Sequence, residues 1–452
     1  MLPVVTFRLA AVAATAALLA LVVPPRWVLA LNALLAAAAI VDWLRAPRPA
    51  RVTVTRDAPD VLTRGGTGRL TWTVHNPTGR PLRVALADEL VSALGAPTRR
   101  AAMVVPPHGR ALRGVDLHPQ RRGRFVLQRV TLRVTGPWGL AARQRWLPLR
   151  HVLTVYPQFR SRAQTELRLQ QARQLQLGER AVRIRGGGMD FDALREYTVD
   201  DEIRRIDWAA TARSPQTIVR TYRAERNQNV LLLVDCGRTM AAMVGAPGAQ
   251  AGSAPEVASV TDAGGLPRLE HAMDAAQAIT RLATGLGDRV GMIAFADRVL
   301  ATLQPRNQAD QLRRLTRELA AIEPRLVESD YRGAFASALS RFPRRSLLIV
   351  LTELANEAAT QTLLPALGLL RRRHLVMVAA VRDPVVEDWH TAPTRTVEQT
   401  YRRAAAVRTL DQRAAITTQL RAGGATVIDV VPGGLAATLC DAYLDTKAAG
   451  RL

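Results

Sequence analysis

The chain has 452 residues and is poor in cysteine, lysine and aromatic residues, which narrows the functions it can have. Its two cysteines, Cys236 and Cys440, lie far apart in the sequence and form no metal-binding pattern. They fit a reducing compartment. Lys447 is the one lysine among 62 basic residues, and aromatic residues make up 4% of the chain.

The formal net charge of +24 and the pI near 11.5 would ordinarily indicate nucleic acid or an acidic membrane surface as a partner. The strong preference for arginine is explained more simply by the codon usage of a GC-rich genome. No recognition helix, aromatic stacking platform or zinc-finger spacing accompanies the charge. We therefore expect no nucleic-acid partner.

Motifs of common enzymes are missing as well. The sequence has no GxSxG, no HExxH and no cysteine with a plausible histidine partner. A triple glycine at 186–188 is not followed by Lys-Ser or Lys-Thr, which excludes a P-loop. The sequence predicts a protein that is not an enzyme; an unrecognised hydrolase of envelope components stays open as an alternative, with no acid–base pair to name.

Two apolar segments, Val4–Val23 and Trp27–Leu44, predict a transmembrane helical hairpin within residues 1–46. Each is close to the ~20 residues that cross a bilayer as a helix. A cleavable signal peptide and a buried helical hairpin are the alternatives. Under the positive-inside rule, the arginines after the second segment place the bulk of the chain in the cytoplasm. These arginines are Arg45, Arg48 and Arg51.

Residues 51–159 alternate apolar with polar residues in short runs that turn residues interrupt. Such runs are typical of strands, and an antiparallel β-sandwich of immunoglobulin-like type accounts for them. Residues 160–190 contain a basic, Gln-rich stretch that predicts a linker helix, and the triple glycine at its end predicts a hinge.

Residues 230–452 alternate short apolar runs with segments of helical periodicity, which predicts an α/β domain with a doubly wound parallel sheet. Asp235 ends the first predicted strand, and ligands of such sheets bind beyond the carboxyl ends of the strands. Residues 243–267, rich in Gly, Ala, Ser and Pro, predict a flexible insertion beside this position.

Between these parts, residues 191–229 contain the pattern LREY, an acidic turn, R-x-IDW and TAR, followed by a strand that ends in Asp235. This pattern resembles the domain-of-unknown-function-58 family. The resemblance implies a von Willebrand A-like fold for residues 230–452 and a membrane-anchored protein of the bacterial inner membrane. It also implies an adaptor or scaffold that acts with a MoxR-type AAA+ ATPase in assembly or maturation of envelope-associated complexes.

The charged residues of the signature are balanced in sign, and two aromatic side chains stand among them. One interpretation is a network of ion pairs that pins the segment to the neighbouring sheet, with Tyr197 and Trp208 as anchors. The other is a docking surface for a protein or for an acidic or phosphorylated ligand. The candidate residues are Arg195, Glu196, Tyr197, Asp201, Arg204, Asp207, Trp208, Arg213 and Arg220.

Von Willebrand A domains commonly bind a divalent cation through Asp-x-Ser-x-Ser, a threonine and a later aspartate. The resemblance therefore proposes a ligand set for Mg²⁺ or another divalent cation, and with it a metal-dependent ligand receptor as an alternative function. Gly237 replaces the first serine and Arg238 stands inside the loop, so a carboxylate paired with a neighbouring arginine is the competing interpretation. The candidate ligands are Asp235, Thr239, Asp330 and Glu353.

Overall fold

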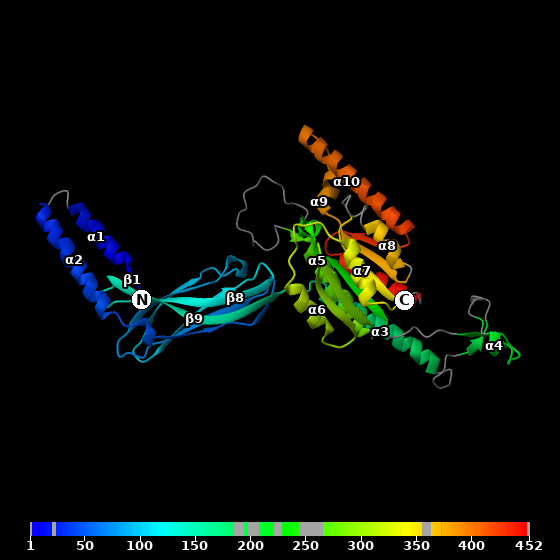
Figure 1. Cartoon of the computed structure of the whole chain (residues 1–452), viewed down its shortest axis with the longest axis horizontal. Coiled ribbons are helices and arrows are strands. Elements are labelled where there is room, and N and C mark those ends of the chain that lie inside the picture. The colour runs from blue at the N-terminus through cyan, green and yellow to red at the C-terminus, as the bar shows by residue number, and fades with distance from the viewer. Residues whose placement is uncertain are drawn as a thin grey trace. The chain divides into compact units, whose positions relative to one another are not determined.

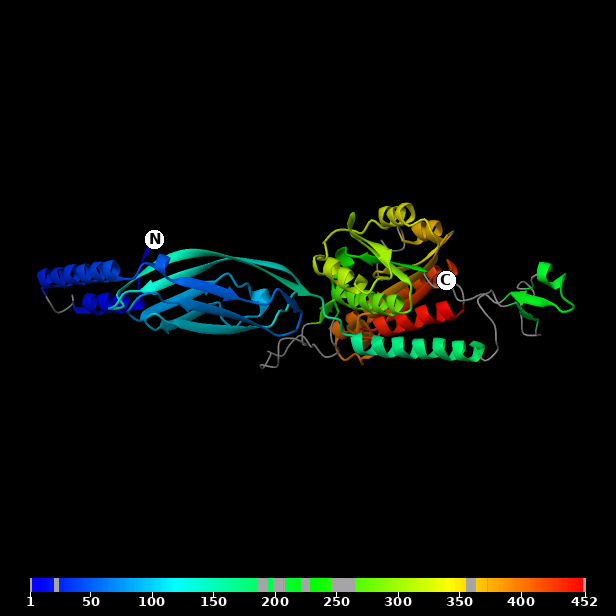
Figure 2. The ribbon, with the colours of Figure 1, turned by 90° about the horizontal axis from the view of Figure 1, so that it is seen from below.

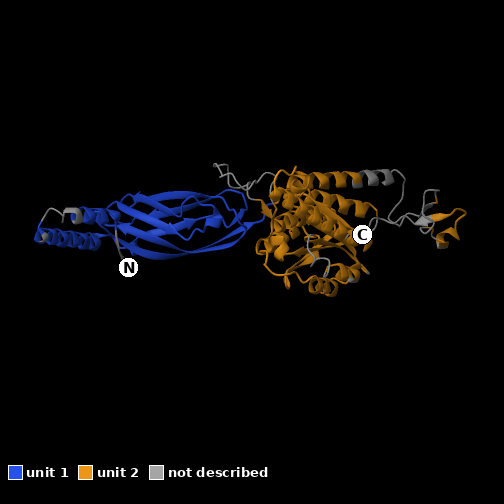
Figure 3. Cartoon of the chain, turned by 90° about the horizontal axis from the view of Figure 1, so that it is seen from above, with its two compact units in different colours: residues 1–158 blue, residues 159–452 orange. Residues whose placement is uncertain are grey.

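The computed structural model describes residues 2–19, 24–184, 194–197, 206, 208–220, 228–244, 265–354, 363–371 and 373–449. The chain divides into two compact units, residues 1–158 and residues 159–452 (Figure 3). Each unit is described by itself.

The first unit begins with β1 (Leu2–Val5) and two apolar helices, α1 (Phe7–Leu19) and α2 (Pro25–Arg45), which contact one another (Figure 1). Among the described residues, the helical segment Arg26–Arg51 is long and apolar enough to cross a membrane, with a mean hydropathy of 1.9. The prediction that the first helix starts at Val4 is wrong. Val4 and Val5 pair with a strand of the following sandwich, which gives their backbone groups hydrogen-bond partners before the helix begins.

Two sheets build the rest of the first unit, and they form the β-sandwich that the alternating runs predict. The larger sheet has the order β1-β9-β8-β5-β6, with β3 beside β9, and the smaller has the order β2-β4-β7. All pairs are antiparallel except β3 with β9. The strands are β2 (Thr53–Asp57), β3 (Val61–Thr63), β4 (Gly68–His75), β5 (Leu82–Asp88), β6 (Arg100–Val105), β7 (Arg110–Leu117), β8 (Gly123–Thr135) and β9 (Ala141–Tyr156).

Alternate residues of these strands fill the core between the sheets, because successive side chains of a strand point to opposite faces. On β4 these are Leu70, Trp72 and Val74, all 1% exposed or less. Trp72 donates its indole N–H to Asp88 at 2.7 Å, and Arg56 binds the same carboxylate through two nitrogens, at 2.9 and 2.5 Å. The buried charges of Arg56 and Asp88 are thus paired, as burial requires.

The second unit opens with α3 (Arg162–Ile184), which was predicted as a linker helix. The structure shows instead that α3 packs on the α/β domain, beside α11 (Leu435–Ala448) in Figure 2. Leu169 is 1% exposed and belongs to the domain core. Glu166 of α3 receives two hydrogen bonds from Arg281, at 2.7 and 3.0 Å. The prediction failed because the many polar residues of α3 hid a narrow apolar stripe. The glycines at 186–188 lie outside the described residues.

The central sheet of the second unit has the order β16-β15-β12-β17-β18-β19. Five strands are parallel, as predicted, and their apolar runs are buried on both faces. The sixth, β16, runs antiparallel to β15 at one edge and was not predicted. Its residues are only partly buried, so it lacks the continuous apolar run of the others. The strands are β12 (Asn229–Asp235), β15 (Arg289–Phe295), β16 (Val299–Arg306), β17 (Ser346–Leu351), β18 (Leu375–Val381) and β19 (Thr426–Val430).

Helices cover both faces of this sheet, so the sheet is doubly wound. One core cluster joins it to α3, α5, α6 and α11, and a second joins it to α7, α8 and α10. Two helices, α9 and α11, were not predicted. Of the predicted insertion, Met243–Val244 (β13) and Leu266–Pro267 (β14) pair as a short antiparallel ladder, and residues 245–264 lie outside the described residues. The other helices are α5 (Arg268–Gly285), α6 (Gln311–Ala320), α7 (Tyr331–Arg341), α8 (Leu364–Arg371), α9 (Pro384–Thr391) and α10 (Val397–Ala422).

Candidate functional site

The carboxylate of Asp235 lies at the carboxyl edge of the sheet and is fully buried. Its Oδ1 accepts hydrogen bonds from Ser329 Oγ at 2.5 Å and from the backbone N–H of Gly237 at 2.8 Å. Its Oδ2 accepts from the hydroxyls of Tyr331 at 2.8 Å and Thr352 at 2.7 Å. One carboxylate therefore holds together the end of β12, the segment before α7 and the end of β17.

Tyr331 is fixed as a donor in this cluster. Burial and the charge of Asp235 raise the pKa of Tyr331 well above its usual value, so the phenol keeps its proton at neutral pH. Its ring packs edge-on against Phe295 and Phe335, with centroids 5.6 and 6.2 Å away. Ser329, Tyr331 and Thr352 were not named as candidates from the sequence. The available signal was a hydroxyl residue at the end of a second predicted strand, at Thr352.

The four proposed metal ligands do not come together as one set. Thr239 lies in the short 3-10 helix η4 (Arg238–Ala241). Asp330 caps α7 by accepting from the backbone N–H of Gly333 at 2.9 Å. Glu353 is bound by arginines. Among the residues that the structure describes, no group of three His, Cys, Asp or Glu side chains could hold a metal ion.

The departures of this loop from the metal-binding pattern have physical reasons. A Cβ atom at Gly237 would lie 2.0 Å from Ser329 Oγ, so the serine expected there has no room. Arg238 forms an ion pair with Glu328. The competing interpretation expects an arginine beside Asp235; among the described residues, the partners of Asp235 are instead hydroxyls and one backbone amide.

Next to this cluster, a buried group of ions ties α10 to the sheet. Arg413 of α10 donates to both oxygens of Asp429 on β19, each at 2.7 Å, and also to Glu353. Arg268, at the start of α5, lies 2.7 Å from the other oxygen of Glu353. Burial would lower the pKa of Arg413, but the hydrogen bond to Asp429 and the charges of both carboxylates outweigh it and raise that pKa. Glu353, which follows Thr352 at the end of β17, thus binds α10 through Arg413.

The first part of α10 lies with α9 and exposes apolar side chains. A capping box of Thr396 and Gln399 starts α10, and all of residues 391–405 are exposed. Val397 and Tyr401 are each 74% exposed, and Trp389 of α9 is 39% exposed. We name residues 384–405 the α9–α10 arm; Figure 1 shows α9 beside α10. The arm thus presents the side chains of Trp389, Val397 and Tyr401 to solvent.

The signature segment is described only in part. Its strands β10 (Leu194–Glu196) and β11 (Ile218–Arg220) pair so that Arg195 lies opposite Val219, Leu194 opposite Arg220 and Glu196 opposite Ile218. The backbone N–H of Tyr197 continues this ladder to Thr217 at 2.8 Å. Candidate residues Asp201, Arg204 and Asp207 lie outside the described residues.

Two other candidates of this segment are exposed. Trp208 begins the short helix α4 (Trp208–Thr211) and is 68% exposed, and Arg213 is exposed as well. The ion-pair interpretation expects Trp208 to anchor the segment, whereas the structure leaves most of this side chain exposed. Its ring is available on the surface of the segment.

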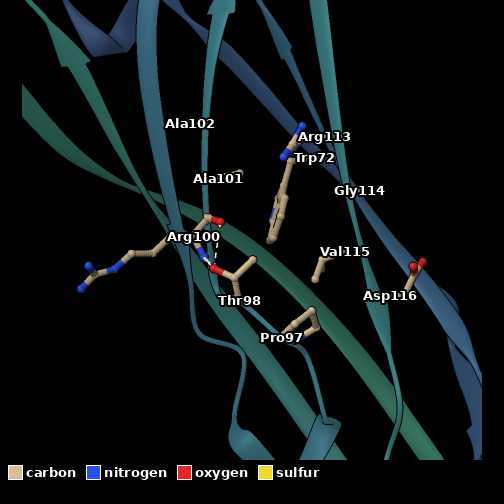
Figure 4. Close-up of a pocket in the computed structure, with 10 residues that line it drawn as sticks. All are labelled: Trp72, Pro97, Thr98, Arg100, Ala101, Ala102, Arg113, Gly114, Val115 and Asp116. Atoms are coloured by element: carbon tan, nitrogen blue, oxygen red, sulfur yellow. Dashed lines mark hydrogen bonds between the residues drawn. The ribbon is translucent and has the colours of Figure 1, made fainter.

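A cavity of about 240 Å³ lies in the β-sandwich between β6 and β7 (Figure 4). Trp72, Ala101 and Val115 contribute apolar lining, while Arg100 and Asp116 point away from the Trp72 ring. The lining contains no histidine, cysteine or serine. It offers no nucleophile with a base beside it, so it is not a candidate active site.

Both cysteines are free and buried. Burial raises the pKa of the Cys440 thiol to about 12. His374 is buried too, and burial lowers its pKa. Cys440 and His374 are therefore held in their neutral forms at pH 7, and both cysteines belong to the packing of the domain.

The segment that begins at the signature is similar to known proteins. Residues 193–250 and 253–414 match a protein-family model. The family is DUF58, described as a protein of unknown function. The match contains the LREY and R-x-IDW motifs, and it confirms the resemblance over these residues.

Uncharacterized proteins of Mycobacterium bovis and Mycobacterium tuberculosis are 25% identical to the chain over 209 residues. The matched region covers 46% of this chain and 59% of each relative, so it spans less than two thirds of the relatives' length.

Among solved structures, the chain is similar to proximal thread matrix protein 1 from the mussel byssus, solved with a zinc-occupied MIDAS motif. That similarity has 9% identity and a TM-score of 0.28, and it covers 51% of this chain and 47% of the other. An uncharacterized membrane-spanning protein from Vibrio fischeri is 14% identical with a TM-score of 0.18, covering 50% of this chain and 99% of that one. The CARDB domain of a Pyrococcus furiosus protein is also 14% identical, with a TM-score of 0.17 and coverage of 23% and 94%. At these TM-scores, the likenesses carry no argument about this chain.

Proposed function

We propose that this protein is a membrane-anchored adaptor or scaffold of DUF58 type that binds another protein through the α9–α10 arm. The observation that carries the proposal is the arm itself: a capped helix start with Val397 and Tyr401 each 74% exposed beside Trp389. A group of exposed apolar side chains on one surface is typical of protein-binding sites.

The composition of the arm supports a protein partner. Arg402 stacks over the ring of Trp389, with its guanidinium carbon 5.6 Å from the ring centroid, and also pairs with Glu398 at 2.5 Å. Tryptophan, tyrosine and arginine are the residues that most often dominate the binding energy of interfaces. Because Arg402 holds the Trp389 ring in place, the arm would lose little side-chain freedom on binding.

The family resemblance suggests which partner to test, a MoxR-type AAA+ ATPase. In this proposal the α/β domain is von Willebrand A-like, and its sheet edge positions α10 through Arg413. The protein would act in assembly or maturation of complexes near the bacterial inner membrane.

The anchor in this proposal is the pair α1 and α2 as a transmembrane hairpin. Segment Arg26–Arg51 supports it by length and hydropathy, with 6% of its apolar window buried against protein. A helix this apolar needs lipid or protein around it. Arg45, Arg48 and Arg51 favour a cytoplasmic location for the following domains.

We also infer that the protein is not an enzyme. At the Asp235 cluster, three hydroxyls donate to one carboxylate that is 0% exposed. A base that a substrate atom cannot reach has no proton to remove from it. The alternative, a metal-dependent receptor, retains Asp235 with the hydroxyls of Ser329 and Thr352 at the sheet edge. Of the other proposed carboxylate ligands, Glu353 binds arginines and Asp330 caps α7, so neither is left free for a cation.

The test of the adaptor function is co-purification of the full-length chain from its host in mild detergent. We expect Val397→Ser/Tyr401→Ser to lose a AAA+ ATPase that the unchanged protein retains. Truncating one interface hot spot weakens binding by roughly thirtyfold or more, so loss should be nearly complete.

The matched control is Leu167→Ser/Leu175→Ser on α3. These two leucines are 56% and 71% exposed and lie outside the arm. Loss of the ATPase in both double variants, or retention in both, would contradict the arm as the binding site. Absence of any AAA+ ATPase with the unchanged protein would refute this partner.

A further inference from the structure

We propose that the end of the β-sandwich next to α1 and α2 is a binding surface for anionic phospholipid headgroups. We name it the collar, and its residues are Arg8, Trp43, Arg45, Arg83 and Trp138. The proposal rests on the membrane anchoring proposed above and adds a lipid specificity to it. Its evidence lies entirely within the first unit.

The end of α2 is fixed to the turn between β8 and β9 by a buried carboxylate. Asp42 is fully buried and accepts hydrogen bonds from three backbone N–H groups of the turn. The donors are Trp138 at 2.8 Å, Leu140 at 2.8 Å and Ala141 at 2.9 Å. A Cβ atom at Gly136 would lie 2.5 Å from this carboxylate, so the turn needs glycine there. The carboxylate of Asp42 therefore keeps the end of α2 next to the turn between β8 and β9.

A side chain of β9, Arg143, also binds the end of α2. Arg143 is 9% exposed and donates to the backbone carbonyls of Trp43 at 2.9 Å and Leu44 at 3.3 Å. Its guanidinium carbon also lies 4.8 Å from the centroid of the Trp43 ring. The last carbonyls of α2 thus have a cationic partner, and Trp43 is held beside the sandwich.

Three exposed arginines surround this clamped turn. Arg45 lies over the Trp138 ring at 5.5 Å, and Trp138 itself is 48% exposed. A Cβ atom at Gly139 would lie 3.3 Å from Nη1 of Arg8 and 3.8 Å from Nη1 of Arg83. In the part of the chain that the structure describes, none of these three arginines has a carboxylate within ion-pair distance. The buried Asp42 is already satisfied by the three amides.

The depth of the collar follows from the length of α2. Its 21 residues are about 30 Å long at ~1.5 Å per residue, which equals the hydrocarbon thickness of a bilayer. A spanning α2 therefore ends in the headgroup layer, with Trp43, Arg45 and Trp138 there. Tryptophan prefers this layer. Guanidinium groups bind phosphate through paired hydrogen bonds, and unpaired ones match an anionic headgroup.

The experiment uses the full-length chain in nanodiscs of phosphatidylcholine containing trace spin-labelled phosphatidylglycerol or spin-labelled phosphatidylcholine. The fraction of motionally restricted probe gives the relative association of the two lipids. Each basic residue at a membrane surface strengthens association with anionic lipid by about fivefold. We expect a preference for phosphatidylglycerol of about fivefold or more, falling to near one in Arg8→Gln/Arg45→Gln/Arg83→Gln.

The control variant is Arg124→Gln/Arg150→Gln, which removes two exposed arginines from β8 and β9. Arg124 lies 11 residues from the collar end of β8, about 35 Å at ~3.3 Å per residue, far beyond the ~8 Å screening length. The control should keep the full preference. Equal uptake of both probes by the unchanged protein, or an unchanged preference in the triple variant, would overturn the proposal.

Flotation with vesicles of pure phosphatidylcholine tests the membrane anchor independently of the lipid preference of the collar. A chain that floats but shows no lipid preference refutes the collar and leaves the anchor standing. A chain that does not float refutes the anchor, and with it the depth that places the collar among headgroups.

Discussion

Replacing Arg413 by methionine tests whether the buried ions hold α10 on the sheet. Methionine keeps much of the length of the side chain but removes its charge and hydrogen bonds. Asp429 would lose both of its bonds from Arg413, and Glu353 would keep Arg268. The matched control is Arg402→Met, which removes another arginine of α10 whose partner, Glu398, is exposed.

The magnitude follows from burial. Removing one partner of a buried ion pair costs about 3–5 kcal/mol, because the remaining charge is left without compensation. The side chains of Arg413 and Glu353 are 5% and 3% exposed, whereas that of Asp429 is 16% exposed and can reach some water. We therefore expect the lower end, about 3 kcal/mol. For Arg402→Met we expect at most about 1 kcal/mol, since exposed pairs contribute little.

Hydrogen exchange of the β18 amides in the full-length protein measures this difference. These amides belong to a buried strand that is paired on both sides, with β17 and with β19, so their slowest exchange reports unfolding of the domain. A loss of about 3 kcal/mol speeds that exchange by roughly two orders of magnitude. Adding Asp429→Asn to Arg413→Met should recover part of the loss, because one uncompensated charge disappears. Equal exchange in Arg413→Met and Arg402→Met would refute the reasoning.

Two further predictions concern buried groups of the same domain. Titration of the full-length chain with Mg²⁺ should give no heat, because the proposed ligand set of Asp235 is dispersed; heat that Asp235→Asn abolishes would restore the receptor function. Cys440, with a pKa of about 12, should resist alkylation at pH 8 until the domain unfolds, since only about one thiol in ten thousand is then ionised. The raised pKa favours the folded state fully below pH ~9, and this stabilisation is lost as the pH rises from there toward 12. Rapid labelling of Cys440 in the folded protein at pH 8 would contradict its burial.

The α/β domain was predictable because its parallel strands are buried on both faces. Continuous apolar runs such as the one ending in Asp235 mark such strands without knowledge of their neighbours. Edge strand β16 and helices α9 and α11 were harder to predict, and so was the packing of α3, whose helix itself was predicted. Their residues face partly toward solvent or pack on other helices, so their composition resembles that of surface segments.

The candidate site shows the same division. The position of Asp235 at a strand end follows from the sequence, as does the missing serine at Gly237. The hydrogen-bond donors around the carboxylate could not be predicted from the sequence, because Ser329 and Thr352 are 94 and 117 residues away from Asp235 along the chain. Only the folded sheet brings these loops together.

The sequence by itself determined that the chain has an apolar N-terminus, a β-sandwich and an α/β domain, because local periodicity records which face of each element is buried. It also located the start of the segment that matches the DUF58 family model. Tertiary structure alone decided the partners of the polar groups: hydroxyls on Asp235, arginines on Glu353 and backbone amides on Asp42. These contacts join residues far apart in the chain, and a buried charge is satisfied by whichever donors the packing brings within about 3 Å.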